Sequence, residues 1–138
     1  MENIMIREYE SFNLQDILLL YESVGWINYT ENPNMLMNAF NNSLKIIGAF
    51  DNDKLIGLIR IVGDGYSIIY IQDLLIIPKY QRRGIGKALL EKVLAEYKNV
   101  YQQVLIADDD PNTVSFYTNL GLKPNDKLGL WAFLKYNN

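Results

Sequence analysis

The spacing of hydrophobic residues changes several times along the chain, which predicts an alternation of strands and helices. Short apolar runs rich in β-branched residues predict strands at 4–9, 44–50, 55–62, 68–77 and 102–107. Apolar residues that recur every three or four positions predict helices at 14–24, 33–40, 88–98 and 112–120. A final run, Leu128 to Tyr136, predicts a strand that closes a hairpin with residues near Leu122.

The order of these elements favours an α+β fold. Three strands follow one another before the central helix, which is typical of an antiparallel sheet with separate helices. The strand at 102–107 follows that helix, so it can pair in parallel with 68–77 through a right-handed crossover. With no linker or repeat in sight, we expect one domain over residues 1–138, with six to seven strands and about four helices.

The turn between the strand at 68–77 and the central helix is the most informative stretch of the sequence. Gly84 and Gly86 leave the backbone amides open to an approaching group. Arg82, Arg83 and Lys87 place positive charge beside the first free N–H groups of the helix. These features predict an anion-binding turn.

Two well-known phosphate-binding motifs do not fit this turn. A Walker A loop ending at Lys87 would need a glycine at position 81 and a hydroxyl at 88, where the chain has Gln81 and Ala88. A dinucleotide fingerprint beginning at Gly84 would need a small residue at 89, where Leu89 stands. The anion is therefore held by another kind of loop.

The composition excludes several kinds of chemistry. The chain has no histidine and no cysteine, which removes catalytic triads, thiolate nucleophiles and Cys/His zinc sites. A net charge of −3 without a long basic stretch argues against nucleic acid as a partner and suits a cationic acceptor. Asp108 to Asp110 lack the spacing of a calcium loop and are better explained as a helix start, so no metal is expected.

The sequence also carries expectations about the protein's location. The first residues lack the basic and apolar regions of a signal peptide, and no segment approaches the roughly 20 apolar residues of a membrane span. We therefore expect a soluble, cytoplasmic protein that does not bind membranes. The lack of cysteine adds nothing, because it suits any redox compartment.

Two motifs resemble those of the GNAT superfamily of N-acetyltransferases. The stretch Gln81-x-x-Gly84-x-Gly86 is similar to that family's pyrophosphate loop, and Phe116-Tyr117-x-x-x-Gly121-Leu122 is similar to the stretch that closes its cofactor site. The resemblance implies acetyl-CoA as acetyl donor, bound where two parallel strands splay apart. The cofactor-binding residues that it implies are Leu74, Leu75, Ile76, Gln81, Arg82, Arg83, Gly84, Ile85, Gly86 and Lys87.

The resemblance also suggests catalytic residues. Tyr117 matches the tyrosine that the family often uses as general acid, and a phenol can give a proton to a departing thiolate. Some relatives carry a glutamate as base where this chain has Gln72, which cannot accept a proton. We nominate Asp73 instead, with a water chain as the rival. Side chains alternate along a strand, so only one of Gln72 and Asp73 reaches the cleft unless the strand bulges.

The acceptor is left open by the sequence. Trp26 and Tyr29 lie in an aromatic connector between the first two predicted helices, where they either cover the core or bind substrate. We expect a small-molecule or peptide amine that attacks the acetyl group directly in a ternary complex, and a homodimer is compatible with this. The alternative is a non-catalytic acyl-CoA sensor or interaction module.

Overall fold

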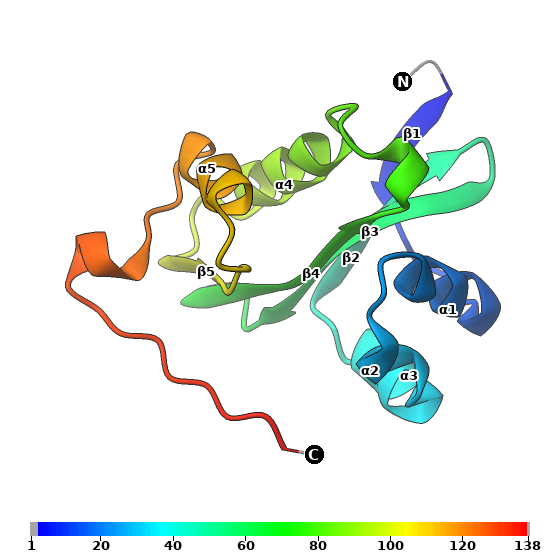
Figure 1. The fold of residues 1–138 in the computed structure, drawn as a ribbon, viewed down its shortest axis with the longest axis horizontal. Helices are drawn as coiled ribbons and strands as arrows, with labels where there is room; N and C mark the ends of the chain where they lie inside the picture. Colours follow the sequence, from blue (N-terminus) through cyan, green and yellow to red (C-terminus); the bar gives the residue numbers. More distant parts are fainter. Residues whose placement is uncertain (1–2, 138) are drawn as a thin grey trace. The chain divides into compact units, whose positions relative to one another are not determined.

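The computed structural model describes residues 3–137, and the chain divides into a larger unit ending at Leu105 and a smaller one beginning at Ile106. The larger unit contains one five-stranded sheet (Figure 1). Its strands, in spatial and chain order, are β1 (Ile4–Glu8), β2 (Lys45–Asp51), β3 (Lys54–Gly63), β4 (Ile68–Ile76) and β5 (Gln102–Leu105). Neighbouring strands are antiparallel except β4 and β5, which are parallel. The predicted α+β class and the parallel pair are confirmed.

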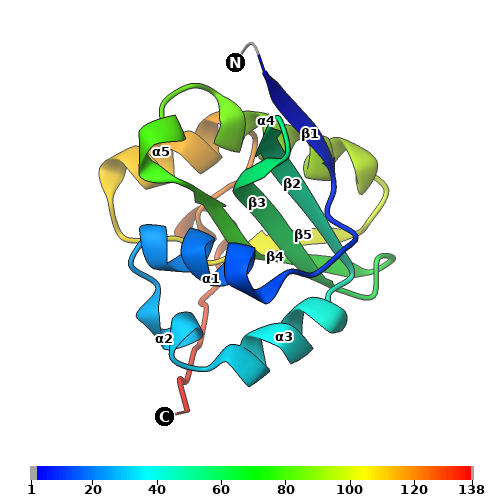
Figure 2. The same ribbon diagram turned by 90° about the vertical axis from the view of Figure 1, so that its right-hand side faces the viewer.

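Helices cover both faces of this sheet (Figure 2). One face carries α1 (Leu14–Ser23), α2 (Ile27–Thr30) and α3 (Pro33–Asn41), and the other carries α4 (Ile85–Glu96). The Asn13 side chain caps α1 by accepting the N–H of Asp16 at 3.1 Å. Within residues 26–30, which the sequence presents as a connector, Ile27–Thr30 form the one-turn helix α2, with Trp26 as its N-cap.

Apolar side chains from α1 and α3 bury one face of the sheet. The cluster consists of Ile17, Leu20, Tyr21, Leu36, Phe40, Ile46, Phe50, Leu55, Leu58 and Leu75. On the opposite face α4 buries Leu89, Leu90 and Val93, which repeat at helical spacing. Each such side chain stabilises the fold by about 1.5–3 kcal/mol. The sheet is therefore held rigidly between two apolar layers, and its β4 edge can position reacting groups.

The smaller unit contains α5 (Pro111–Asn119) and the 3-10 turn η2 (Asn125–Leu128). Residues 129–137 form neither helix nor strand, so the predicted strand from Leu128 to Tyr136 is wrong. The described sheet accordingly has five strands rather than six to seven. The apolar pattern of this segment is that of a strand, but residues near Leu122 offer it no partner strand.

Candidate functional site

The glycine-containing turn lies between the end of β4 and the start of α4. A short 3-10 turn, η1 (Pro78–Tyr80), leads into it. The Gln81 side chain donates a hydrogen bond to the carbonyl of Ile76 at 2.9 Å, which ties the turn to the last residue of β4. The buried Tyr80 adds a second anchor, because its hydroxyl donates to the carboxylate of Asp51. Gln81, predicted as a cofactor ligand, thus has a clear role in shaping the loop.

The first turn of α4 presents free backbone amides. Gly84 is the N-cap with φ of 80°, a conformation that favours glycine, and it makes no side-chain capping bond. The N–H groups of Ile85, Gly86 and Lys87 precede the first hydrogen bond of the helix, from Ala88 N–H to the Gly84 carbonyl at 3.0 Å. A phosphate oxygen is a suitable partner for such amides.

Positive side chains surround these amides. Arg82, Arg83 and Lys87 are all exposed, and Arg82 itself has a positive φ of 63°. The Arg83 guanidinium lies 5.2 Å from the centre of the Tyr80 ring, which supports its position by a cation–π contact. The donor set of backbone N–H groups and exposed cations therefore fits a pyrophosphate.

The edge of β4 next to this turn has no partner strand. β4 and β5 pair only from Ile68 and Gln102 to Ile71 and Leu105. After Ile71, β5 has ended. Within residues 3–137, no strand pairs with this side of β4 at Leu74, Leu75 and Ile76. Exposed N–H and C=O groups of this kind can bind an extended amide-containing chain by strand addition.

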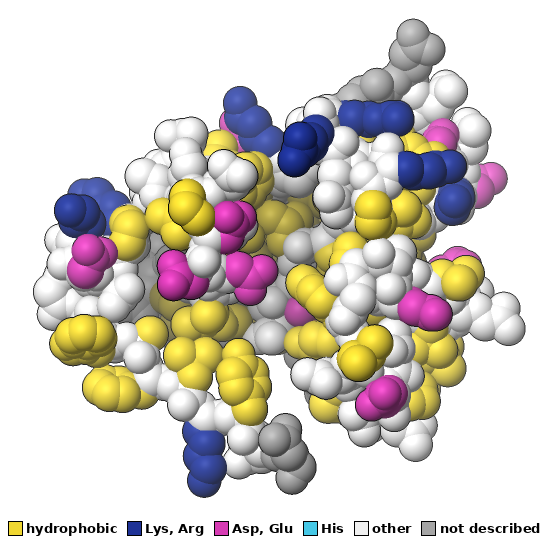
Figure 3. All heavy atoms as spheres, viewed as in Figure 1, with side chains coloured by type: hydrophobic (Ala, Val, Ile, Leu, Met, Phe, Trp, Pro, Cys, Tyr) yellow, Lys and Arg dark blue, Asp and Glu magenta, His cyan; other side chains and the backbone are white. Residues whose placement is uncertain are grey.

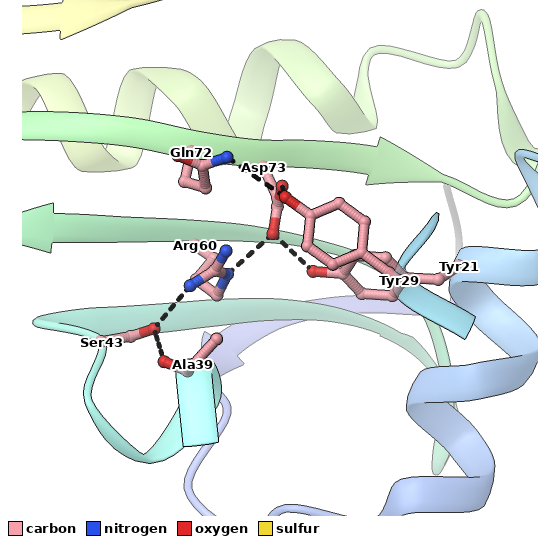
Figure 4. A network of polar contacts seen from close by, with 7 residues as sticks. All are labelled: Tyr21, Tyr29, Ala39, Ser43, Arg60, Gln72 and Asp73. Carbon is pink, nitrogen blue, oxygen red and sulfur yellow. Dashed lines mark hydrogen bonds and ion pairs between the residues drawn. The ribbon is translucent and has the colours of Figure 1, made fainter. Parts of the chain in front are cut away.

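A β-bulge lies in the middle of β4. Arg60 on β3 faces Asp73, whereas its neighbour Ile61 faces Ile71, so Gln72 is the extra residue. As a result Gln72 and Asp73 both contact the hydroxyl of Tyr29, as Figure 4 shows. Gln72 Nε2 donates to it at 3.2 Å, and the hydroxyl donates to Asp73 Oδ1 at 3.3 Å.

The Asp73 carboxylate lies in a buried polar network (Figure 4). Only 2% of this side chain is exposed. Its Oδ2 accepts hydrogen bonds from Arg60 Nε and from the Tyr21 hydroxyl, each at 2.7 Å. Arg60 also donates to Ser43 Oγ at 3.2 Å. A buried carboxylate and guanidinium of this kind compensate each other's charge.

Sequence reasoning missed Arg60 and Tyr21 as members of the site. The available signal was Arg60 itself, the only charged residue inside the apolar run from Leu55 to Val62. A charge in the interior of a buried strand requires an opposite charge nearby. Its partner could not be identified, because Asp73 is brought opposite Arg60 by the strand register and the bulge.

The network changes the acid–base properties of its members. Burial, followed by the Asp73 carboxylate, raises the pKa of the Tyr21 hydroxyl far above its usual value. The same two causes raise the pKa of Tyr29. For Arg60, burial alone would lower the pKa, but the charge and hydrogen bond of Asp73, together with the nearby hydroxyls of Tyr21 and Tyr29, outweigh it and the pKa is raised. Both tyrosines therefore remain protonated hydrogen-bond donors at neutral pH.

Trp26 and Tyr29 pack against other aromatic side chains on the face of the sheet that carries α1, α2 and α3. Their ring centres are 6.1 Å apart, and Tyr29 lies 5.2 Å from the ring of Tyr21. Both side chains are half-buried against the core cluster. The structure thus shows the core-covering role for both, and it gives Tyr29 a polar contact to Asp73 as well.

Tyr117 belongs to the smaller unit, on α5. Its ring packs edge-to-face on Phe116, with 5.0 Å between ring centres. Burial and the nearby Asp108 carboxylate raise the pKa of the Tyr117 hydroxyl. Asp110 is the N-cap of α5, and its carboxylate accepts a hydrogen bond from Thr113 at 3.2 Å. No cluster of three or more acidic residues among those the structure describes is arranged to hold a metal ion.

Comparisons with known proteins place this geometry in a family. The family model described as "Acetyltransferase (GNAT) domain" matches residues 22–128. Over 128 residues the chain is 32% identical to an uncharacterized ycf52-like N-acetyltransferase of Prochlorococcus marinus, an alignment that spans 89% of this chain and 69% of the relative.

Solved structures agree with this assignment. A GNAT-family acetyltransferase of Streptococcus pneumoniae is 37% identical, has a TM-score of 0.87 and aligns over 97% of this chain and 98% of its own. The PaiA N-acetyltransferase of Thermoplasma acidophilum, solved in complex with coenzyme A, shares the fold at a TM-score of 0.69 and 22% identity, over 87% of this chain and 89% of its own. No helix within residues 3–137 is long and apolar enough to cross a membrane. The chain belongs to the GNAT family of N-acetyltransferases.

Proposed function

We propose that this protein binds acetyl-CoA at the Gly84 turn and the open edge of β4, and that it transfers the acetyl group to a primary amine in a ternary complex. GNAT enzymes use acetyl-CoA and acetylate amines. The observation that supports the proposal most strongly is the uncapped N-terminus of α4 directly after an unpaired strand edge. Two parts of one ligand, a pyrophosphate and an amide-containing arm, suit these two neighbouring features.

The proposal assigns a role to each part of the loop. The amides of Ile85, Gly86 and Lys87 would hold the pyrophosphate, while Arg82 and Arg83 add charge from the surface. Gln81 holds the turn against Ile76. The backbone of Leu74 to Ile76 would bind the pantetheine arm and polarise the acetyl carbonyl. When bound, acetyl-CoA supplies an activated thioester.

The Tyr29 hydroxyl would contact the acceptor amine. This hydroxyl donates a hydrogen bond to Asp73, so its oxygen lone pairs are available to accept from Gln72 and from an incoming N–H group. Trp26 would line the same side of the site through its contact with the Tyr29 ring. Burial keeps the Asp73 carboxylate from touching the substrate. If Asp73 is the base, it acts through Tyr29, and the rival is a water chain.

Tyr117 would protonate the departing thiolate. Its support is the match of its sequence position to the family motif. Burial raises the pKa of the Tyr117 phenol, which keeps the proton on it at neutral pH but makes it a weaker acid. Neither histidine nor cysteine is present to take this role.

A binding assay followed by a turnover assay tests the proposed function. Isothermal titration with acetyl-CoA should show micromolar binding, roughly −8 kcal/mol. Polyamines, amino acids, aminoglycosides and lysine peptides are then assayed for release of free thiol. Binding without turnover on any acceptor would identify the chain as a non-catalytic sensor, and no binding at millimolar acetyl-CoA would contradict both functions.

A further inference from the structure

The hydrogen bonds of the buried network have a fixed direction. The Arg60 guanidinium pairs with the Asp73 carboxylate, and a carboxylate in an ion pair only accepts hydrogen bonds. The Tyr29 hydroxyl therefore uses its one proton to donate to Asp73 Oδ1 at 3.3 Å. Its oxygen can then only accept from Gln72, so the Gln72 amide turns its nitrogen toward Tyr29, as Figure 4 shows.

This direction leaves the Gln72 carbonyl oxygen for a ligand. The amide oxygen and nitrogen branch from one carbon, so Oε1 turns away from Tyr29 when the nitrogen faces it. Among residues 3–137 no group donates to Oε1, and the side chain is exposed. The Tyr29 oxygen keeps one lone pair beside its contact with Gln72. The two side chains together present two neighbouring hydrogen-bond acceptors.

Gln72 lies at the inner end of the open β4 edge. Pairing with β5 stops at Ile71, and the open edge continues from there to Ile76 and the turn. Lys and Arg side chains gather over the start of α4, as the dark blue atoms in the upper part of Figure 3 show. Phosphates bound there direct the arm of the cofactor back along this edge, so that its acetyl end lies near Gln72.

No titratable group of the network is free to take a proton from the acceptor. Arg60 on β3 is a cation, and the Asp73 carboxylate is 2% exposed and already accepts from Arg60, Tyr21 and Tyr29. Burial, followed by the Asp73 carboxylate, raises the pKa of Tyr21 on α1 and of Tyr29 on α2, so both keep their protons. A proton relayed through Tyr29 to Asp73 would leave the Arg60 charge buried without its partner. An ammonium acceptor thus finds no base in the network.

We propose that Gln72 Oε1 and the Tyr29 oxygen bind the two N–H groups of a neutral primary amine, so that the preferred acceptor is a weakly basic amine such as the α-amino group of a peptide. Resting on the acetyl transfer proposed above, this assignment leaves the nitrogen lone pair free to attack the thioester carbon. The attack forms the C–N bond and breaks the C–S bond, and sulfur gains one proton for the one that nitrogen loses. Asp73 and Arg60 are positioning residues, because they set the direction of the bonds that orient Tyr29 and Gln72.

Two versions of one peptide test the acceptor class. One has a free N-terminus and an acetylated lysine, and the other has an acetylated N-terminus and a free lysine. At pH 7 about a tenth of α-amino groups but less than about 0.1% of lysines are neutral, so kcat/KM should be at least about tenfold higher for the first peptide. From pH 7 to 9.5, kcat/KM should level off near pH 8 for the α-amine and rise about tenfold per pH unit for the lysine. An equal or better lysine peptide, or one plateau shared by both, would overturn the proposal.

Gln72→Leu tests the contact itself. The variant keeps a side chain of similar length without Oε1, so KM for the α-amine peptide should rise at least about fivefold while acetyl-CoA binding by calorimetry is unchanged. Gln102→Leu makes the same change at another exposed strand glutamine and should alter neither constant. Gln72→Glu adds a carboxylate that can take a proton, so the rise of the lysine peptide between pH 7 and 9 should disappear. An unchanged KM in Gln72→Leu would show that Gln72 does not contact the acceptor.

A double variant tests the fixed direction of the bonds. Because the Tyr29 hydroxyl orients the Gln72 amide, Tyr29→Phe/Gln72→Leu should raise KM by less than the product of the two single effects. Effects that multiply fully would contradict this coupling. Turnover with normal acetyl-CoA binding but no dependence on Gln72 would overturn the assignment and leave the proposed function intact, whereas no turnover on either peptide would contradict both.

Discussion

Arg60 and Asp73 face each other across β3 and β4, with Nε and Oδ2 2.7 Å apart and both side chains almost inaccessible to solvent. This pair is the register position next to the bulge at Gln72 in β4. Because Asp73 also accepts the hydrogen bond of Tyr29, the ion pair links the interior of the sheet to a residue that we propose meets the acceptor. The following predictions test this link and the cofactor site.

Arg60→Met should destabilise the protein strongly. The substitution leaves the Asp73 charge buried without its partner, which costs about 3–5 kcal/mol of unfolding free energy. Urea unfolding followed by circular dichroism measures the effect. The triple variant Arg60→Met/Asp73→Leu/Tyr21→Phe removes both charges together with the buried hydroxyl that would lose its acceptor, and it should recover most of the loss. An Arg60→Met variant within about 1 kcal/mol of the parent would contradict the importance of the pair.

Tyr21→Phe should lower stability by an amount that depends on pH. The lost hydrogen bond to a carboxylate is worth about 1.5–3 kcal/mol. The folded-state pKa of Tyr21 is raised above its unfolded value near 10, so its contribution is full below about pH 10 and declines as pH rises further. Urea unfolding of both proteins should show the same difference in unfolding free energy at every pH from 8 to about 10. Between pH 10 and 11.5 this difference should shrink. A difference that stayed constant throughout would refute this linkage.

Tyr29→Phe should impair the reaction with the acceptor while leaving acetyl-CoA binding intact. The ring can still pack on Tyr21, but the hydroxyl that contacts Gln72 and Asp73 is lost. On the best amine of the panel, a rise in KM alone indicates that the hydroxyl binds the acceptor, whereas a fall of about 10²-fold or more in kcat indicates proton transfer. Tyr21→Phe removes the other tyrosine hydroxyl from Asp73 and serves as the matched control. Unchanged kinetics in Tyr29→Phe would exclude both roles.

Gly86→Val should abolish acetyl-CoA binding. A branched side chain in the first turn of α4 would occupy the space beside the amides and restrict the backbone. Glu91→Val places the same side chain at an exposed position further along α4 and controls for the effect of valine on the helix. Arg82→Ala and Arg83→Ala should weaken binding less, because the amides remain. Titration calorimetry decides, and normal binding by folded Gly86→Val would show that the ligand binds elsewhere.

Tyr117→Phe should lower kcat far more than it raises the KM for acetyl-CoA. The ring contact with Phe116 is kept, but the proton for the leaving thiolate is lost, at a cost of about 10² to 10⁴ in rate. Steady-state assays of thiol release measure both constants under conditions where chemistry limits turnover. Turnover within about twofold of the parent would assign Tyr117 a packing role only.

Local patterns in the sequence were sufficient for most of the fold. The apolar periodicity placed the strands and helices, because each pattern reports which face of an element is buried. The glycines of the turn and the absence of histidine and cysteine indicated the ligand class and excluded other mechanisms. The predicted strand from Leu128 to Tyr136 was wrong, because an apolar pattern shows that a segment can form a strand but does not show that a partner strand is available to it.

Tertiary structure decided the polar network. The sequence presents Gln72 and Asp73 as alternatives, because side chains alternate in a regular strand. A bulge is a property of two paired strands, and here it brings both side chains to Tyr29. Register likewise sets Arg60 against Asp73, and helix packing brings Tyr21 to the same carboxylate from 52 positions away. Contacts between distant segments depend on how the sheet and helices pack, and no single-segment pattern contains that information.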